Sequence, residues 1–209
     1  MIQHNTIRQV LPGFEPELYK EMFRYGQVNT QAAGTTFINM GDPIKSVILV
    51  LEGIVKLYQK DSEGNKFFMY SIHGGQACAI SLVSDYHEEL SSVMALAYTD
   101  TMTLTIPLEL MDKWLMQYKS WHYFILRSYR DRYDDLLQTV NEIAFRNMDE
   151  RLEFYIRRYV KQFGNQVKLT HQEISNDLNS SREVISRLLK KMEKNGWIII
   201  HRSYFDWVK

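Results

Sequence analysis

The sequence predicts an α+β protein with an N-terminal antiparallel β-roll of jelly-roll-like type, a long helix and a C-terminal winged helix-turn-helix. Short strand-like segments separated by glycine turns occupy Thr35–Ile106. After Pro107 the apolar residues recur at helical spacing. Two short amphipathic helices then flank the polar residues 179–181. The predicted domains are a roll and sensor domain at 1–120, a dimerisation helix at 121–146 and a winged helix-turn-helix at 147–209.

The first half of the chain predicts one helix, over Pro16–Tyr25, followed by strands. Expected strands are Val47–Tyr58 with a break at Glu52-Gly53, Lys66–Ile72 after a hairpin tip at 61–65, Val93–Ala97 and Thr101–Ile106. A further strand is expected over Ala77–Ser84. Together with Tyr70–His73, this strand is a candidate lining for a cavity that holds an apolar or uncharged ligand. An equally good interpretation is a filled roll that binds nothing.

The second half predicts helices over Leu108–Tyr118, Trp121–Phe145 and Met148–Phe163. Within the long helix, apolar and aromatic residues recur with alternating steps of four and three, which is a heptad pattern: Tyr129, Tyr133, Leu136, Val140 and Ile143. The pattern favours self-association, because a two-fold DNA reader needs a dimer helix. The alternative is an amphipathic helix that packs only on its own domain.

The segment Leu169–Trp197 predicts a helix-turn-helix that reads DNA. Its apolar stripes have helical spacing: Leu169, Ile174 and Leu178, then Val184, Ile185, Leu188, Leu189 and Met192. The second helix follows cap residues at 179–181. Arg182, Glu183, Ser186 and Arg187 share a face near the start of that helix, where such proteins contact base edges. Residues 197–208 then predict a short two-stranded wing.

Charge and composition agree with this division. The net charge is zero, but residues 1–146 hold 13 Lys and Arg against 17 Asp and Glu, whereas residues 147–209 hold 12 against 8. The excess of positive charge therefore lies with the helix-turn-helix, as phosphate binding requires. The single cysteine, Cys78, excludes an intramolecular disulfide. Neither a secretory signal nor a membrane span is evident, so we expect a cytoplasmic protein.

The run LTHQEISNDLNSSREVISRLLKKMEKNGWI resembles the helix-turn-helix of the Crp–Fnr family of bacterial transcription regulators, and the order of domains is similar too. The resemblance implies that Arg182, Glu183 and Arg187 read bases, since Arg can bind guanine and Glu can accept from cytosine. The alternative for both arginines is an intrahelical ion pair with Glu183. Candidate phosphate contacts are Thr170, Gln172, Ser181, Ser186, Lys190 and Lys191. The resemblance also implies a homodimer on a two-fold operator with TGTGA-like half-sites, with RNA polymerase as a further candidate partner.

The sensor half resembles the family more loosely. Gly41-Asp42, the run LEGIV (51–55) and Gly74-Gly75 match its turn glycines, but the cyclic-nucleotide signature is missing. The segment after Gly75 has no Gly-Glu pair, and no Lys or Arg occurs between Lys66 and Lys113 to neutralise a phosphate. We therefore expect that cyclic AMP is not the effector. The candidate pocket residues are Gly75, Cys78, Ser81, Ser91 and Ser92.

No cofactor is predicted, and the effector is unknown. One cysteine cannot hold an iron–sulfur cluster of the kind bound by the family's oxygen sensors. His73 and Cys78 are a weak candidate pair of haem ligands, and Cys78 is more simply explained as a small buried hydrophobe. An enzyme is disfavoured because the sequence has neither metal-spaced histidines nor a Gly-x-Ser-x-Gly or phosphate-loop motif. Two hypotheses remain: a regulator that senses a small molecule, and a ligand-independent regulator whose roll is only a dimerisation or protein-interaction scaffold.

Overall fold

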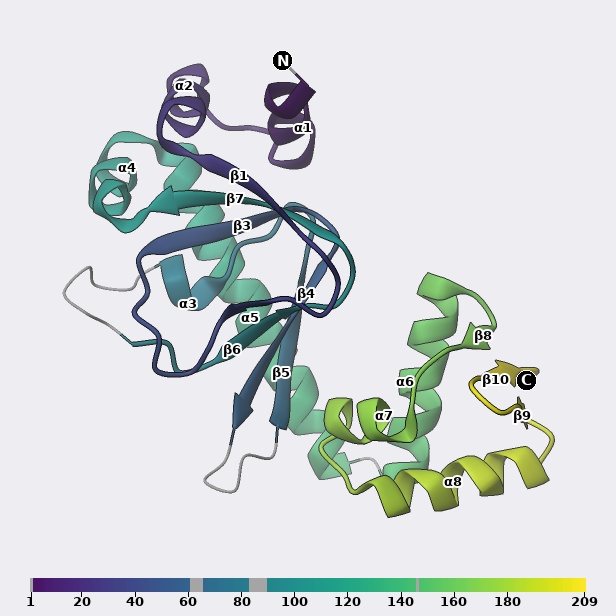
Figure 1. The fold of residues 1–209 in the computed structure, drawn as a ribbon. Coiled ribbons are helices and arrows are strands. Elements are labelled where there is room, and N and C mark those ends of the chain that lie inside the picture. The colour runs from purple at the N-terminus through teal and green to yellow at the C-terminus, as the bar shows by residue number, and fades with distance from the viewer. Residues whose placement is uncertain (1, 61–65, 83–89, 146) are drawn as a thin grey trace. The chain divides into compact units, whose positions relative to one another are not determined.

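The computed structural model describes residues 2–60, 66–82, 90–145 and 147–209. The chain divides into two compact units (Figure 1). One comprises Met1–Asn65 with Met69–Leu136, and the other comprises Lys66–Phe68 with Leu137–Lys209. The division falls inside helix α5 (Lys119–Phe145). The hairpin tip expected at 61–65 lies outside the described residues.

The strands between residues 27 and 107 form two antiparallel sheets, which confirms the expected roll (Figure 1). The first sheet has the order β1-β7-β3, from Gln27–Gln31, Thr101–Pro107 and Ser46–Glu52. The second has the order β2-β6-β4-β5, from Thr36–Ile38, Met94–Ala97, Ile54–Lys60 and Lys66–His73. In the first sheet, Leu49 lies opposite Leu104 and both are buried. The alternating apolar residues thus form one inner face.

The break predicted at Glu52-Gly53 is confirmed, because Gly53 separates β3 from β4 with a φ of +88°. A Cβ at this position would lie 2.3 Å from the carbonyl oxygen of Asp100. Both the backbone conformation and the close approach therefore require glycine.

Two elements of the first unit were not predicted, helix α1 (Ile2–Val10) and strand β1, whereas β2 lies within the predicted strand region Thr35–Ile106 without having been assigned individually. In addition, the strand expected over Ala77–Ser84 is wrong, because Ala79–Leu82 forms helix α3. The carbonyl of Cys78 accepts hydrogen bonds from both the backbone N–H and the hydroxyl of Ser81, at 3.0 and 2.8 Å. This local bonding closes a helical turn and so competes with strand pairing.

The helices after the roll follow the predicted order. Helix α2 (Pro16–Tyr25) has the predicted bounds, whereas the segment 108–118 is divided into a 3₁₀ turn (Leu108–Leu110) and α4 (Met111–Gln117). Helix α5 begins two residues before the predicted start, and its first turns are anchored by the fully buried Trp121. Among the described helices, none is both long and apolar enough to cross a membrane.

The second unit contains α6 (Met148–Phe163), α7 (His171–Asp177) and α8 (Arg182–Lys194). Its sheet has the order β8-β10-β9, from Gln166–Val167, Phe205–Trp207 and Ile198–Ile200. The predicted wing is present, but it has a third strand because β8 pairs with β10. Two residues are too few to give a recognisable strand pattern in the sequence.

Candidate nucleic-acid interface

Polar side chains fix the starts of both helices of the helix-turn-helix. Thr170 is the N-cap of α7, and a capping box joins it to Glu173. Ser181 caps α8, since its hydroxyl accepts from the backbone N–H of Val184 at 3.3 Å. These bonds satisfy backbone donors that have no partner within their helices. The predicted N-cap chemistry of residues 179–181 is confirmed.

The turn between the two helices is held from helix α6. Asn179 has a φ of +51°, a conformation that asparagine tolerates better than most residues. The carbonyl of Leu178 accepts from Arg151 at 2.7 Å, and the hydroxyl of Tyr155 donates to Asp177 at 2.7 Å. The end of α7, from which the turn leads into α8, is therefore bonded twice to helix α6.

The apolar faces of α7 and α8 form the core of the second unit, as the sequence predicted. Helix α6 and the small sheet contribute the remaining apolar side chains of this core. Val184 is the exception to the predicted stripe, since it is only partly buried. The buried residues of the predicted stripes are Leu169, Ile174, Leu178, Ile185, Leu188, Leu189 and Met192.

The opposite face of α8 presents the predicted base-reading residues to solvent. Arg182, Glu183 and Arg187 are all exposed. Neither arginine forms an ion pair with Glu183 among the described contacts, so the intrahelical alternative finds no support. The backbone N–H of Glu183, the hydroxyl of Ser181 and the charge of Arg182 lower the pKa of the Glu183 carboxyl. Glu183 is therefore ionised at neutral pH and can accept hydrogen bonds.

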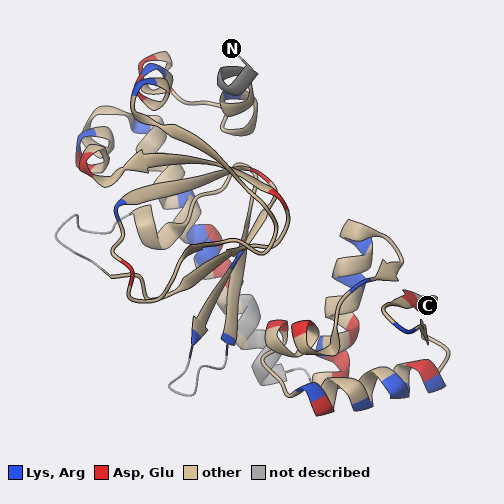
Figure 2. Ribbon diagram, viewed as in Figure 1, with Lys and Arg blue, Asp and Glu red and all other residues tan. Residues whose placement is uncertain are grey.

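The candidate phosphate contacts differ in how far they are already engaged. Thr170 and Gln172 are exposed, and the Gln172 amide donates to Asn176 at 2.9 Å within its own helix. Lys190 is exposed at the surface of α8. The ammonium of Lys191, in contrast, lies 2.6 Å from Asp149, which offsets its charge. Figure 2 shows the basic residues spaced along α8.

Ser186 is half-buried rather than exposed, and its hydroxyl lies 2.7 Å from Nδ1 of His171 on α7. A hollow of about 540 Å³ lies between the starts of α7 and α8 and the wing. Arg182, His171 and Arg202 are among its lining residues. Neither His171 nor Arg202 was predicted as a contact. The only sequence feature that could have indicated His171 as a DNA contact is its position between the two predicted phosphate contacts Thr170 and Gln172.

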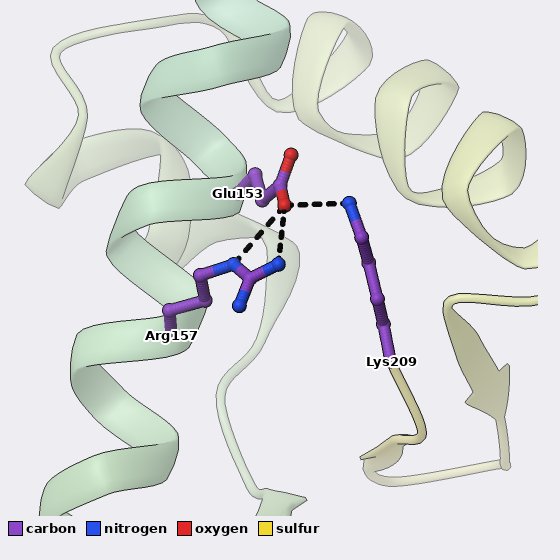
Figure 3. A network of polar contacts seen from close by, with 3 residues as sticks. All are labelled: Glu153, Arg157 and Lys209. Carbon is purple, nitrogen blue, oxygen red and sulfur yellow. Dashed lines mark hydrogen bonds and ion pairs between the residues drawn. The ribbon is translucent and has the colours of Figure 1, made fainter.

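An ion network ties the end of the wing to α6 (Figure 3). A carboxylate oxygen of Glu153 lies 2.9 Å from Arg157 and 2.8 Å from Lys209. The hydrogen bonds from Lys209 and Arg157 lower the pKa of the Glu153 carboxyl. The network therefore stabilises the folded unit above the unfolded pKa of Glu153, and this contribution is lost as pH falls through the folded pKa.

The long helix α5 exposes most of the predicted stripe. Tyr133, Leu136 and Val140 are at least half exposed, and Leu126 extends the stripe by one step toward the N-terminus. Tyr129 is more covered, since its hydroxyl donates to the carbonyl of Ala79 in α3 at 2.7 Å. The side chain of Ile143 lies outside the described residues. An exposed apolar stripe of this length is typical of an interaction surface.

The roll contains a cavity of about 100 Å³, bounded by α3 and by strands of both sheets. Three predicted pocket residues line it: Cys78, Ser81 and Ser91. Two do not, because Ser92 is exposed and Gly75 lines a different hollow, beside the start of α5. Apolar side chains form the rest of the lining: Phe37, Ile38, Ile44, Ile48, Val50, Val55, Ile72, Ile80, Val93 and Ala95, with Ser46 and Lys45.

Two of the hydroxyls that line this cavity are already bonded. The hydroxyl of Ser81 donates to Cys78, and that of Ser91 donates to the carbonyl of Val93 at 2.7 Å. Burial raises the pKa of the Cys78 thiol, which keeps it uncharged. Lys45 is the only lysine or arginine among the described lining residues, and it is exposed. The cavity therefore offers dispersion contacts and few free hydrogen-bonding groups.

One arginine that the sequence did not place at the roll lies beside strand β5. Arg132 comes from α5, and its guanidinium stacks 4.6 Å from the ring of Tyr70. It also donates to the carbonyl of Ser71 at 3.1 Å and pairs with Asp135 at 3.1 Å. Arg132 is not among the lining residues of the roll cavity, but it lines the separate hollow that contains Gly75.

Two family models match the chain. A cyclic nucleotide-binding domain matches residues 29–118, and a Crp-like helix-turn-helix domain matches residues 150–205. The chain belongs to the Crp–Fnr family. It is a DNA-binding transcription regulator with a cyclic nucleotide-binding-like domain.

Known regulators and a solved structure match most of this chain. It is 23% identical over 185 residues to the global nitrogen regulator of Synechococcus elongatus, covering 85% of this chain and 83% of that protein. It is 24% identical over 180 residues to the cAMP-activated global transcriptional regulator CRP of Haemophilus influenzae, covering 81% and 78%. A solved Crp/Fnr-family structure from Eubacterium rectale gives a TM-score of 0.83 at 21% identity, covering 93% and 91%.

Proposed function

We propose that this Crp–Fnr regulator binds, as a homodimer, a two-fold operator with TGTGA-like half-sites. The observation that carries the proposal is the exposed triplet Arg182, Glu183 and Arg187 at the start of α8. Arg can donate two hydrogen bonds to guanine, and ionised Glu183 can accept from cytosine. Both residue types are present on one face of a helix whose start is fixed by its caps.

The exposed stripe of α5 is the proposed dimer interface. Leu126, Tyr133, Leu136 and Val140 would leave a continuous apolar surface in water if the chain stayed monomeric. Packing this stripe against a second copy buries it and gives the two-fold symmetry that a palindromic operator needs. RNA polymerase remains a proposed further partner, with no surface assigned to it.

A salt titration tests operator recognition. Fluorescence anisotropy would compare a TGTGA palindrome with a scrambled duplex of equal length across a range of salt concentrations. We expect the palindrome to bind about 10³-fold or more tightly, and both affinities to fall as salt rises. Equal affinity for the two duplexes at every salt concentration would contradict the proposal.

For the sensor, we propose a small uncharged apolar effector rather than cyclic AMP. The cavity of about 100 Å³ is small beside the roughly 300–1,000 Å³ that drug-sized ligands occupy. An apolar cavity of comparable size is known to accept molecules such as benzene. A cyclic phosphate would find only one lysine or arginine among the described lining residues, the exposed Lys45, and Arg132 is bound to other partners outside the cavity. The cAMP-activated relative from Haemophilus influenzae does not by itself carry its ligand over to this chain.

Thermal unfolding tests the effector proposal. A small apolar probe such as toluene, at about tenfold above its dissociation constant, is expected to raise the Tm by about 3–6 °C. The variant Ala95→Leu fills the cavity and is expected to abolish this shift, because Ala95 lines it. Cyclic AMP is expected to cause no shift, and stabilisation by micromolar cyclic AMP would contradict the proposal. Identical behaviour of the native chain and Ala95→Leu with every apolar probe would favour the ligand-independent scaffold instead.

A further inference from the structure

His171 joins the two helices of the helix-turn-helix. It is the first residue of α7, and its Nδ1 lies 2.7 Å from the hydroxyl of Ser186 on α8. The ring is only partly buried, and it contributes to the hollow between the helices and the wing. With Nδ1 occupied by Ser186, Nε2 is the nitrogen left for a ligand in that hollow. His171 was not among the residues predicted to contact phosphate.

The bond to Ser186 can persist in both charge states of the imidazole. A serine hydroxyl can donate to an unprotonated Nδ1 or accept from a protonated one. Protonation therefore does not require the ring to leave Ser186. The imidazole can therefore gain or lose a proton without moving. A contact whose strength depends on protonation of this ring requires such a fixed position.

The surroundings of His171 keep it neutral in the free protein. Burial first, and then the positive charges of Arg182 and Lys190 on α8, lower the pKa of the imidazole. On its own helix, Glu173 is turned back to the backbone N–H of Thr170 at 2.7 Å. Across the hollow, the wing contributes Arg202, and also His201, which pairs with Asp206 at 2.9 Å. No carboxylate among these groups is directed at His171 to favour its charged form.

We propose that His171 binds a DNA phosphate as the imidazolium and takes up a proton when the protein binds DNA. The proposal rests on the proposed use of this face for DNA. The hollow beside His171 is also lined by Arg182 and Arg202, whose positive charges favour an anion there. A phosphate bound there would place a negative charge beside the imidazole and so favour its protonated form.

The sign of the pH dependence follows from these charges. The free-state pKa lies below the ordinary value of about 6.5, and a bound phosphate raises it. Affinity for DNA therefore increases as pH falls through the bound-state pKa, and it becomes constant below the free-state pKa. A difference of one pKa unit corresponds to a tenfold change in affinity per subunit.

Anisotropy titrations between about pH 8 and pH 5.5, at constant salt, test the proposal. The native chain is expected to bind about tenfold more tightly per subunit at the acidic end, if binding shifts the pKa by one unit. His171→Gln is expected to keep the weaker, high-pH affinity throughout. His171→Arg carries a permanent charge and is expected to keep the tighter affinity throughout. His122→Gln, at an exposed histidine on α5 outside the hollow, serves as the matched control and is expected to retain the native pH dependence.

Two further measurements separate a phosphate contact from a structural role. At low pH, the salt dependence of the native chain should show about one more phosphate neutralised per subunit than that of His171→Gln. Calorimetry in buffers of different ionisation enthalpy should show proton uptake that is absent in His171→Gln. The same pH dependence in His171→Gln and the native chain, with operator specificity intact, would overturn this inference alone. Loss of specificity in the native chain would instead contradict the proposed operator recognition.

Discussion

Replacement of Arg182 by alanine is expected to weaken operator binding by about 1–3 kcal/mol per half-site and to relax specificity at one base pair. Arg182 is exposed at the first position of α8, so its loss should leave the fold intact. The affinity for random DNA should fall much less, because only the single charge is lost there. Binding to an operator series with every substitution in one half-site would measure both effects.

Lys190→Ala is the matched control for Arg182→Ala, since Lys190 is an exposed cation on the same helix. This variant should weaken specific and random DNA alike and reduce the salt dependence by about one unit. Lys191 is a poorer control, because Asp149 already holds its ammonium. Equal losses on specific and random DNA from Arg182→Ala would contradict the base-reading role assigned to it.

Leu136→Glu is expected to prevent dimerisation and, through it, operator binding. Leu136 is 57% exposed in the single chain, so glutamate there should not disturb the monomer fold. In the proposed dimer, two carboxylates would face each other within an apolar interface, where unpaired charges are costly. Sedimentation should show a monomer, and operator affinity should fall by about 100-fold or more, because one half-site alone must then provide the binding energy.

Met116→Glu tests whether any added surface charge has the same effect. Met116 is 87% exposed on α4, away from the α5 stripe, and receives the same new side chain. Its variant should remain dimeric and bind the operator normally. A dimeric Leu136→Glu protein with native operator affinity would show that the stripe has another purpose.

The parts that could be predicted from sequence depend on local patterns. The spacing of Ile174, Leu188 and their neighbours, with the cap at Ser181, was enough to place both helices of the helix-turn-helix. The short helix α3 was predicted as strand, because four residues give no helical period and the bonds of Ser81 to Cys78 decide the conformation.

Contacts between distant residues could not be read from the sequence. Asp149 and Lys191 are separated by 42 positions, and only the packing of α6 against α8 brings them together. Arg132 contacts Tyr70 of β5 from helix α5. The sequence between Lys66 and Lys113 contains no arginine, so it could not reveal this contact. The bond between His171 and Ser186 likewise depends on how α7 and α8 pack. Chemistry shared between elements is therefore the part that the structure adds.

Tyr129 belongs to two surfaces at once. Its ring lies on the α5 stripe, and its hydroxyl holds the carbonyl of Ala79 in α3, next to Cys78 and Ser81 at the roll cavity. A displacement of α3 therefore changes the position or the bonding of a residue in the proposed subunit contact. Thermodynamic linkage makes the relation reciprocal: whatever occupies the cavity and shifts α3 alters the association constant of the subunits, and association alters the affinity of the cavity by the same factor.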